Sequence, residues 1–425
     1  MQQKFIINGG RALAGTIEVR GAKNAATPIL AACLLTEEPC VIDNLPLIED
    51  VFRIIEILQS VGARVEWLGQ RRIKVQAKGI DPKKIDQDKV CRLRSSVLIM
   101  GALFSRFDNF KISAPGGCLI GSRPLNTHFA GLSELGAKIS QDNGFYQVGK
   151  TKLLSGASAR KIILREFSVT ATENVMMVAA LKSGRTSLRV AAAEPHVQEL
   201  AIFLNKMGAK IKGAGTHDLE ITGVKKLRGA KHTLMPDPIE AGTFIVAAAA
   251  TRGRVEIKNV RIEHLELVLE KLKEMGVNLL VGSNSVKIKP SARFHAAKIQ
   301  TLPYPGLPTD LQAPLAVLCT QAEGASLIHD PLYEGRFKYI NELAKMGADA
   351  TIVDPHRAVI QGPTPLYGKE ITSFDLRAGA TLIIAALVAE GQSTISDIYQ
   401  VDRGYEKIEE RLAAIGADIK RANND

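Results

Sequence analysis

Aromatic residues are scarce in this chain. They make up 5% of its 425 residues and include one tryptophan, and no run of basic residues exceeds a few positions. Proteins that bind single-stranded nucleic acids need aromatic side chains for base stacking and basic residues gathered on one face. The charge excess of 55 − 44 = +11 therefore suits an anionic partner such as a phosphorylated metabolite, and we expect no nucleic-acid partner and no obligate protein partner. The alternative, a polyanion-binding repeat protein, would show a steep salt dependence of its DNA affinity.

Long apolar segments and paired cysteines are missing as well. The longest apolar runs, 244–250 and 382–389, fall far short of the ~20 residues that a membrane-spanning helix needs. The start, MQQKFIINGG, lacks the basic and apolar regions of a signal peptide. The cysteines at positions 33, 40, 91, 118 and 319 form no CxxC pair and no zinc-type spacing with the eight histidines, and Walker, GxGxxG and GxSxG motifs are absent. These features predict a reduced, cytoplasmic protein without a membrane association or a metal site.

A short pattern recurs six times along the chain. It reads apolar-x-x-apolar-Gly-apolar-x-apolar, as in LQSVGARV at 58–65 and LAAIGADI at 412–419. Its glycines follow at intervals of 74, 72, 68, 71 and 69 residues: Gly62, Gly136, Gly208, Gly276, Gly347 and Gly416. The residues before each glycine have helical periodicity; those of the fourth copy that share one face are Leu265, Val268, Leu269, Leu272 and Met275. Each glycine therefore predicts the positive-φ end of a helix, with a short strand after it.

A second kind of helix precedes each copy. Segments such as 176–191, 244–260 and 382–398 begin with an Ala-rich helix and end in an alternating β-branched strand. Helices with small and branched apolar residues all round are usually buried on most faces. Each copy thus predicts strand–helix–strand–helix–strand–strand, an α/β fold, and six copies predict two domains of three repeats with a junction near residue 230. A solenoid is the alternative, but a period near 70 residues is longer than the common solenoid units.

Loops that interrupt the repeat are the places where we expect chemistry. In GAKNAA at 21–26, Lys23 stands beside a glycine turn and a helix start, which together suit an anion; an ordinary helix start with a solvated lysine is the alternative. In LPTDLQ at 307–312, Asp310 suits either a helix N-cap or a general base. The segment 236–243 is explained by capping or a hinge. Four arginines at loop or helix ends suit either bidentate binding of carboxylates and phosphates or local ion pairs: Arg94, Arg336, Arg377 and Arg403.

One loop contains a cysteine in an unusual setting. Three glycines and two prolines surround Cys118 in PGGCLIGSRP at 115–124. We expect Cys118 to be exposed, with its thiolate favoured by Arg123. Cys33 and Cys319 lie in apolar segments and are expected to pack in the core.

Taken together, these loops resemble those of one family, the UDP-N-acetylglucosamine 1-carboxyvinyltransferases. The matching stretches run in the family's order from residue 21 to 406: GAKNAA, LRSS, PGGCLIGSRP, ATEN, EAGTF, LPTDLQ, DLRAG and DRGYE. The resemblance implies a two-domain inside-out α/β barrel of six βαβαββ-like repeats. It further implies a first domain over 22–235 that carries the cysteine loop, a second domain made of 1–21 and 236–425, and an active site in the cleft between them.

The resemblance also implies an activity. The enolpyruvyl group of phosphoenolpyruvate would pass to the 3-hydroxyl of UDP-N-acetylglucosamine with loss of phosphate, a step of peptidoglycan synthesis that fosfomycin blocks, without a metal or other cofactor. Four positions are implied to be catalytic: Lys23, Cys118, Asp310 and Arg403. Cys118 would protonate the enol carbon, and Asp310 would take the proton of the attacking hydroxyl. The implied substrate-binding positions are Lys23, Asn24, Arg94, Arg123, Pro124, Leu125, Asn126, Thr127, Ser168, Val169, Asp310, Leu332, Arg377 and Arg403.

The sequence departs from the family pattern in three places. Glu166 adds an acid that does not favour a diphosphate, Thr170 stands where glycine is frequent, and Asn126 stands where aspartate is frequent. None of these positions carries a reacting group. The nearest alternative activity is that of a 5-enolpyruvylshikimate-3-phosphate synthase, which shares the fold and phosphoenolpyruvate but uses no cysteine acid. The other alternative is an inactive paralogue that binds the UDP-sugar.

Overall fold

The computed structural model describes residues 3–116, 121, 123–151 and 159–423. These residues form two compact units. Unit 1 holds 3–20, 121 and 236–423, and unit 2 holds 21–116, 123–151 and 159–235. Apart from residue 121, the described chain therefore leaves unit 1 after residue 20 and re-enters it at residue 236.

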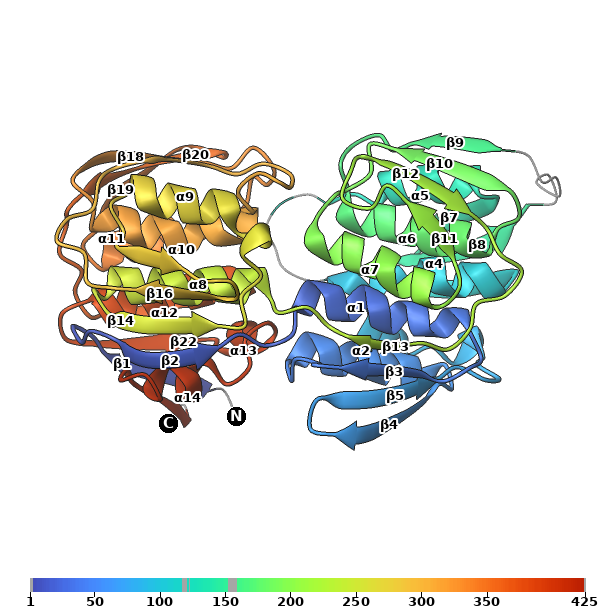
Figure 1. Ribbon diagram of the computed structural model, residues 1–425, viewed down its shortest axis with the longest axis horizontal. Coiled ribbons are helices and arrows are strands. Elements are labelled where there is room, and N and C mark those ends of the chain that lie inside the picture. The colour runs from blue at the N-terminus through green and yellow to red at the C-terminus, as the bar shows by residue number, and fades with distance from the viewer. Residues whose placement is uncertain (1–2, 117–120, 122, 152–158, 424–425) are drawn as a thin grey trace. The chain divides into compact units, whose positions relative to one another are not determined.

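Unit 2 contains the first three repeats around a single hydrophobic core (Figure 1). The first repeat consists of β13 (Lys231–Thr233), α1 (Lys23–Ala32), β3 (Cys40–Asp43), α2 (Glu49–Ser60), β4 (Arg64–Gly69) and β5 (Arg72–Gln76). The second consists of α3 (Gln87–Cys91), α4 (Val97–Arg106), β6 (Asn109–Ser113), α5 (Asn126–Glu134), β7 (Ala137–Asp142) and β8 (Phe145–Lys150). The third consists of β9 (Arg160–Ile163), α6 (Val169–Leu181), β10 (Arg185–Arg189), α7 (Pro195–Lys206), β11 (Lys210–Lys212) and β12 (Asp218–Thr222). The late strand β13 pairs in parallel with β3 and so supplies the first strand of the first repeat.

Unit 1 contains the other three repeats around a second core. The fourth repeat consists of β2 (Ala14–Glu18), α8 (Pro238–Ala250), β14 (Arg254–Lys258), α9 (Glu266–Glu274), β15 (Leu279–Val281) and β16 (Ser285–Ile288). The fifth consists of β17 (Lys298–Gln300), α10 (Thr309–Thr320), β18 (Gly324–His329), α11 (Lys338–Lys345), β19 (Asp349–Asp354) and β20 (Arg357–Gly362). The sixth consists of β21 (Glu370–Thr372), α12 (Leu376–Val388), β22 (Gln392–Ser396), α13 (Tyr399–Asp402), α14 (Ile408–Ala413), β23 (Asp418–Asn423) and β1 (Gln3–Asn8). Because β2 pairs with β14 and β1 lies between β22 and β23, the N-terminal segment completes two sheets of this unit.

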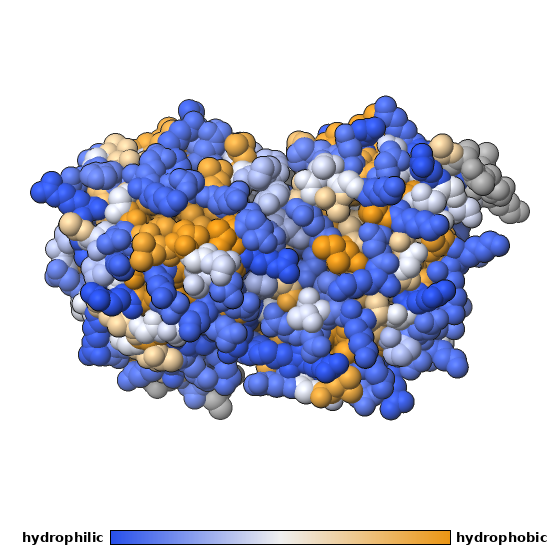
Figure 2. Space-filling view, viewed as in Figure 1, coloured by the Kyte–Doolittle hydropathy of each residue, from blue (hydrophilic) through white to orange (hydrophobic). Residues whose placement is uncertain are grey.

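Helices with apolar residues all round lie inside each unit, and sheets lie at its outer side (Figure 1). In α12, twelve of thirteen residues are buried, and in α6 ten of thirteen are buried, as their alanines and branched residues predict. The interior helices of unit 1, α8, α10 and α12, contact one another, and α4 contacts both α1 and α6 in unit 2. Amphipathic helices such as α9 bury one side only, and the visible faces in Figure 2 are mostly hydrophilic with apolar patches.

Five of the six sheets formed by the described residues share one four-stranded order. In the third repeat the order is β11-β12-β10-β9. Strand β9 runs parallel to β10, and β12 is antiparallel to both β10 and β11. The parallel strands β9 and β10 need a crossover, which the buried helix α6 supplies. The consecutive antiparallel strands β11 and β12 need only a short turn. The predicted order of strands and helices is thus confirmed in these five copies.

The repeat glycines also behave as predicted. All six have positive φ values, from 82° at Gly276 to 108° at Gly347. A side chain strains this conformation, so each glycine ends a helix and allows the chain to turn directly into a strand. Within the described residues, no helix is both long and apolar enough to span a lipid bilayer.

The second repeat departs from the predicted order. Residues 77–96 are all described and contain no strand; their elements are η2 (Pro82–Lys84), α3 and η3 (Arg94–Ser96). Asp81 and Asp86 accept backbone hydrogen bonds that cap the first two of these turns, and this local capping overrides the strand pattern. Within the described residues, the sheet β6-β8-β7 consequently has three strands.

The side chain of Gln87 replaces part of the missing strand. Its Nε2 donates to the carbonyl oxygen of Lys111 at 3.1 Å, and its Oε1 accepts from the backbone N–H of Ser113 at 2.7 Å. The hydroxyl of Ser113 donates to the same Oε1 at 2.9 Å. One amide therefore forms with the edge of β6 the donor and acceptor bonds that a neighbouring strand would form.

We expect Gln87→Ala to weaken the β6 edge. Loss of three hydrogen bonds, each with a net value of about 0.5–1.5 kcal/mol, lowers the local opening free energy by about 1.5–4.5 kcal/mol. Amide exchange at residues 109–113 should accelerate about ten-fold or more, as measured by hydrogen–deuterium exchange. The control is Gln59→Ala, which changes an exposed glutamine on α2. Equal exchange in the two variants would contradict a structural role for Gln87.

Candidate functional site

The start of α1 holds Lys23 in a defined position. Gly21 precedes it at a point where a Cβ would lie 1.8 Å from the carbonyl oxygen of Asn44, so only glycine fits. The Lys23 Nζ lies 3.0 Å from Oδ2 of the buried Asp50, and its side chain is 18% exposed. Lys23 is therefore an anchored cation rather than a solvated lysine. Asn24 follows it and is half-buried.

Arg94 connects two loops that lie far apart in the sequence. It opens the short helix η3 in the stretch where the second repeat departs from the pattern. Its Nη2 donates a short hydrogen bond to the carbonyl oxygen of Arg123. Arg123 is half-buried and begins the predicted segment 123–127, in which Pro124 and Asn126 are exposed and Leu125 and Thr127 are buried.

The start of α6 joins the same region. Ser168 is the N-cap, and its Oγ accepts from the backbone N–H of Ala171 at 3.4 Å; Val169 is the first helical residue. The Thr127 hydroxyl donates to Oε1 of Glu166 at 2.9 Å. Glu166, the acid that departs from the family pattern, thus has a partner in the segment 123–127. The structure brings this segment and the predicted residues Ser168 and Val169 into one region.

The ATEN stretch, residues 171–174, is buried inside unit 2. The Thr172 hydroxyl donates to the carbonyl oxygen of Ser168 at 2.8 Å and accepts from the N–H of Ala192 at 2.9 Å. Burial raises the pKa of Glu173 well above its usual range, and the nearby Glu194 raises it further. These buried residues and their hydrogen bonds therefore stabilise the start of α6.

In unit 1, Asp310 lies between two buried arginines. Its Oδ1 accepts from Nη2 of Arg336 at 2.7 Å, and its Oδ2 accepts from Nε of Arg377 at 3.0 Å. The Asp310 side chain is 21% exposed, whereas that of Arg377 is 4% exposed. Neither Asp310 nor Thr309 caps α10, because Pro308 is the N-cap and no side chain bonds there, so the capping interpretation is wrong.

The electrostatics of this cluster favour ions. Burial lowers the pKa of the Arg377 guanidinium, but Tyr405 and Asp310 outweigh it, and the net pKa lies above the usual value. The pKa of Arg336 is also raised, because Asp310 and Asp375 outweigh its burial. The arrangement therefore maintains two cations around one carboxylate.

Helix capping and ring packing fix Arg377. Asp375 accepts from the backbone N–H groups of Arg377 and Ala378, at 2.8 and 3.0 Å, and so caps α12. The guanidinium carbon of Arg377 lies 5.3 Å from the centre of the Tyr405 ring, and Tyr405 Oη lies 2.8 Å from Oγ1 of Thr243. Asp375 thus serves as the N-cap of α12.

Arg403 and Leu332 are placed by other neighbours. Arg403 is buried at the end of α13, and its Nη1 donates to Oε1 of Gln400 at 3.2 Å. The exposed Leu332 donates its backbone N–H to Oδ1 of Asp330 at 3.0 Å. The fully buried Asp330 also accepts from the hydroxyl of Thr309, and so links Leu332 to the residue before Asp310.

The segment 236–243 and the acid beside Arg403 have structural roles. Asp237 accepts from the N–H groups of Ile239 and Glu240 and caps α8, so the capping interpretation is confirmed. Asp402 accepts two hydrogen bonds from Arg421, at 2.7 and 2.9 Å.

These positions share one feature, a place at or near the start of an interior helix. Lys23, Arg94 and Ser168 stand at or just before the starts of α1, α4 and α6, and Asp310 and Arg377 stand at the starts of α10 and α12. The N-terminal end of a helix carries partial positive charge and unpaired N–H groups, which favour anions. The starts of the interior helices are therefore suited to an anionic substrate.

The predicted cysteine, Cys118, lies outside the described residues. Among the described cysteines, Cys33, Cys40 and Cys319 are buried, which confirms the prediction for Cys33 and Cys319. Burial raises the pKa of the Cys319 thiol to about 12. Cys91 is exposed and is the thiol with which Cys118 must be compared.

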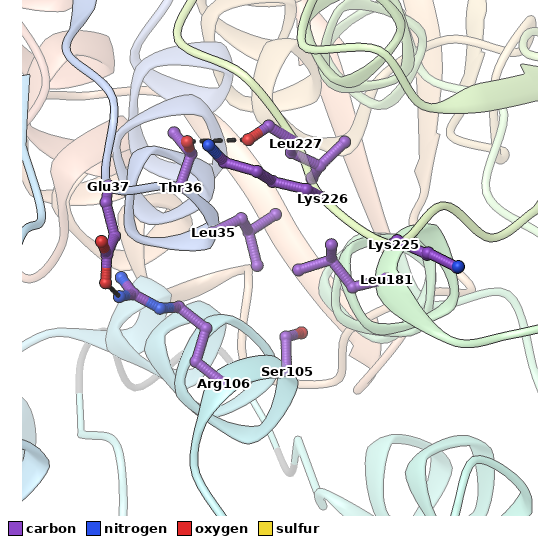
Figure 3. Close-up of a pocket in the computed structure, with 9 residues that line it drawn as sticks. All are labelled: Leu35, Thr36, Glu37, Ser105, Arg106, Leu181, Lys225, Lys226 and Leu227. Carbon is purple, nitrogen blue, oxygen red and sulfur yellow. Dashed lines mark hydrogen bonds and ion pairs between the residues drawn. The ribbon is translucent and has the colours of Figure 1, made fainter.

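A pocket of about 290 Å³ lies at the other ends of the interior helices of unit 2 (Figure 3). Its lining residues are Leu35, Thr36, Glu37, Ser105, Arg106, Leu181, Lys225, Lys226 and Leu227. Arg106 donates to the carbonyl oxygens of Leu34 and Ala77 and to Glu37, at 2.8, 2.9 and 3.1 Å. Through these three bonds the arginine joins the end of α4 to the loops around Leu34, Glu37 and Ala77.

Sequence reasoning did not assign site roles to Arg336, Asp330, His128 and Asn174. Arg336 was visible as one of the dispersed arginines, and Asn174 as part of ATEN, but nothing in the local pattern indicated their partners. Asp330 and His128 had no signal beyond standing next to predicted residues.

Comparisons with known proteins agree across the whole chain. The model of the family "EPSP synthase (3-phosphoshikimate 1-carboxyvinyltransferase)" matches residues 7–412. The UDP-N-acetylglucosamine 1-carboxyvinyltransferase 1 of Caldanaerobacter subterraneus is 44% identical over 422 residues, which cover 99% of this chain and 100% of that protein. The UDP-N-acetylglucosamine 1-carboxyvinyltransferase of Coxiella burnetii is 44% identical over 422 residues, which cover 99% and 96%.

Solved structures show the same fold. The enolpyruvyl transferase NikO from Streptomyces tendae superposes with a TM-score of 0.89 at 25% identity and covers 100% of both chains. An EPSP synthase from Acinetobacter baumannii superposes with a TM-score of 0.75 at 21% identity and covers 99% of this chain and 100% of its own. The predicted α/β fold of six repeats is therefore confirmed.

Proposed function

The chain belongs to the EPSP synthase family, and on that premise we propose that it transfers the enolpyruvyl group of phosphoenolpyruvate to the 3-hydroxyl of UDP-N-acetylglucosamine, with release of phosphate. This is the first committed step of peptidoglycan synthesis. The relatives named for this reaction support the choice of acceptor. The observation that carries the chemistry is Asp310, a partly exposed carboxylate that accepts hydrogen bonds from two buried arginines.

The cations of both units suit phosphoenolpyruvate, which carries a carboxylate and a phosphate. We assign this role to Lys23, Arg94, Arg123 and Arg403, with Arg377 beside Asp310. Several fixed cations at helix starts stabilise the charge that moves during the reaction without reorganising. In this proposal residues of both units act on one pair of substrates.

The reaction proceeds in two balanced stages. Cys118 gives its proton to C3 of phosphoenolpyruvate while the 3-hydroxyl oxygen forms a bond to C2, and Asp310 takes the hydroxyl proton. The C2–O bond to phosphate then breaks, and the leaving phosphate takes the proton held by Asp310. The Cys118 thiolate takes a proton back from C3, and the double bond returns in the transferred group. Each proton transfer requires a positioned acid or base, and an ionised carboxylate is the state that a base needs.

We assign the binding of the nucleotide sugar to a second group of residues. These are Asn24, Pro124, Leu125, Asn126, Thr127, Ser168, Val169 and Leu332. The bond from Thr127 holds the exposed Glu166 beside this group of residues. We also assign the protein to the cytoplasm, because the four described cysteines are all free.

Phosphate release tests the acceptor directly. We expect the enzyme to release phosphate from phosphoenolpyruvate when UDP-N-acetylglucosamine is present, and not when it is absent or replaced by shikimate 3-phosphate. Release with shikimate 3-phosphate would favour the EPSP synthase reaction. If no acceptor supports release, the inactive-paralogue alternative takes its place.

A further inference from the structure

A buried hydrogen-bond network joins the starts of α4, α5 and α6 in unit 2. Two of its members, His128 and Asn174, have no role in the proposed reaction. Asn174 of α6 reaches α4: its Oδ1 accepts from the N–H of Gly101 and its Nδ2 donates to the carbonyl oxygen of Val97, both at 3.0 Å. An N–H can only donate and a carbonyl can only accept, so these two backbone groups fix the orientation of the Asn174 amide. Asn174 is completely buried.

The fixed amide determines the proton position on His128. Nδ2 of Asn174 lies 3.0 Å from Nδ1 of His128, and because this Nδ2 is a donor, Nδ1 must be the acceptor. The proton of the neutral ring is therefore on Nε2, which lies 3.1 Å from the hydroxyl oxygen of Thr170 and donates to it. The His128 residue is 2% exposed. Burial lowers its pKa to about 3, with a smaller contribution from Arg94, so the ring stays neutral and the network intact at neutral pH.

The network connects the segments to which we assign substrate contacts. His128 directly follows segment 123–127, Thr170 directly follows Ser168 and Val169, and Val97 begins the helix that follows Arg94. The hydrogen bond from Thr127 to Glu166 runs beside it and joins two of these segments a second time. A shift of any one of these helix starts would have to break a buried hydrogen bond.

We propose that His128 is a positioning residue of the nucleotide-sugar site, which acts through Asn174 and Thr170 to fix the start of α5 against the starts of α4 and α6. The assignment of these segments to the nucleotide sugar rests on the proposed function. Thr170 stands where the family pattern frequently has glycine, and a relative with glycine there has no side chain to form this bond. His128 itself contacts none of the reacting groups in this account.

A matched pair of variants at Thr170 tests the proposal. Thr170→Val keeps the shape of the side chain but removes the hydroxyl, which leaves the buried Nε2–H of His128 without its acceptor, whereas Thr170→Ser keeps the hydroxyl. We expect Thr170→Val to raise both the Kd and the KM for UDP-N-acetylglucosamine about five-fold or more. The kcat and the KM for phosphoenolpyruvate should change less than about two-fold, and Thr170→Ser should restore the affinity. Half-buried Thr170 is a mild site for substitution, and the melting temperature of each variant checks the fold.

Nitrogen NMR of protein with labelled histidine nitrogens measures which ring nitrogen of His128 carries the proton, and it needs no substrate. Nδ1 of His128 should resonate as an unprotonated nitrogen and Nε2 as a protonated one. The opposite tautomer, or a Thr170→Val variant with unchanged affinity for the nucleotide sugar, would overturn the proposal. Equal losses in kcat and in both KM values would also overturn it, because they indicate general damage. A wild-type protein that does not bind UDP-N-acetylglucosamine would instead contradict the proposed function, while the NMR result would still report on the network.

Discussion

The substitution Asp310→Asn should lower kcat by about 10²- to 10⁴-fold, the usual contribution of a general base. The amide has nearly the same shape but cannot take the proton of the attacking hydroxyl. The dissociation constant of UDP-N-acetylglucosamine should change much less, because the cations and helix starts around the position remain. Phosphate release gives kcat, and equilibrium titration gives the affinity.

A matched control is available in the same unit. Asp354 accepts from Nε of Arg357 at 2.7 Å on the outer strand pair, and Asp354→Asn therefore removes an aspartate–arginine pair away from the predicted residues. This control should leave kcat unchanged. A normal kcat in Asp310→Asn would remove Asp310 from the chemistry. A loss of affinity as large as the loss of kcat would make it a binding residue instead.

Replacing Cys118 with alanine should reduce turnover by about 10²- to 10⁴-fold, because the enol carbon then lacks a positioned acid. In the wild-type protein Cys118 should be alkylated faster than any other cysteine, and fosfomycin should inactivate the enzyme by modifying it. Cys33, Cys40 and Cys319 are buried, so they are protected from reagents. Peptide mass spectrometry over a time course identifies the modified residue.

Cys91 provides the control for this experiment, since it is exposed. Its Sγ lies 3.1 Å from the carbonyl oxygen of Asp88, and no predicted role attaches to it. Cys91→Ser should retain turnover and sensitivity to fosfomycin. If the first label appears on Cys91, or if Cys118→Ala turns over normally, the role assigned to Cys118 is wrong.

Local patterns in the sequence predicted the elements of the fold well. The six glycines ended helices at positive φ because that conformation excludes most side chains, and a spacing near 70 residues made the repeat visible. The interior helices could be recognised because they lack a polar face. The second repeat was the exception, since two capping aspartates and a proline convert its expected first strand into short turns.

Partnerships between distant residues could not be predicted in the same way. Asp310 was singled out from its loop, but its partners Arg336 and Arg377 stand 26 and 67 positions away. His128 and Asn174 are separated by 46 positions, and neither belongs to a periodic pattern that would reveal the other. Such pairs depend on which helix starts meet, and the periodicity of one helix contains no information about its neighbour. The family resemblance supplied roles for single residues and left these supporting contacts out.

The chain passes from unit 1 to unit 2 after residue 20, and this fixes the order in which the two units can be completed during synthesis. All the described strands and helices of unit 2 lie between residues 21 and 235, so they can be assembled once the ribosome has passed this point. Unit 1 must wait, because β1 pairs with β23 through partners as distant as Gln3 and Asn423. Until β14 emerges, β2 lacks its hydrogen-bonding neighbour, and β1 lacks both of its neighbours until β22 and β23 emerge. Unpaired strand edges are prone to associate with other chains. Strand β1 thus leaves the ribosome before all of unit 2 but is among the last strands to be incorporated.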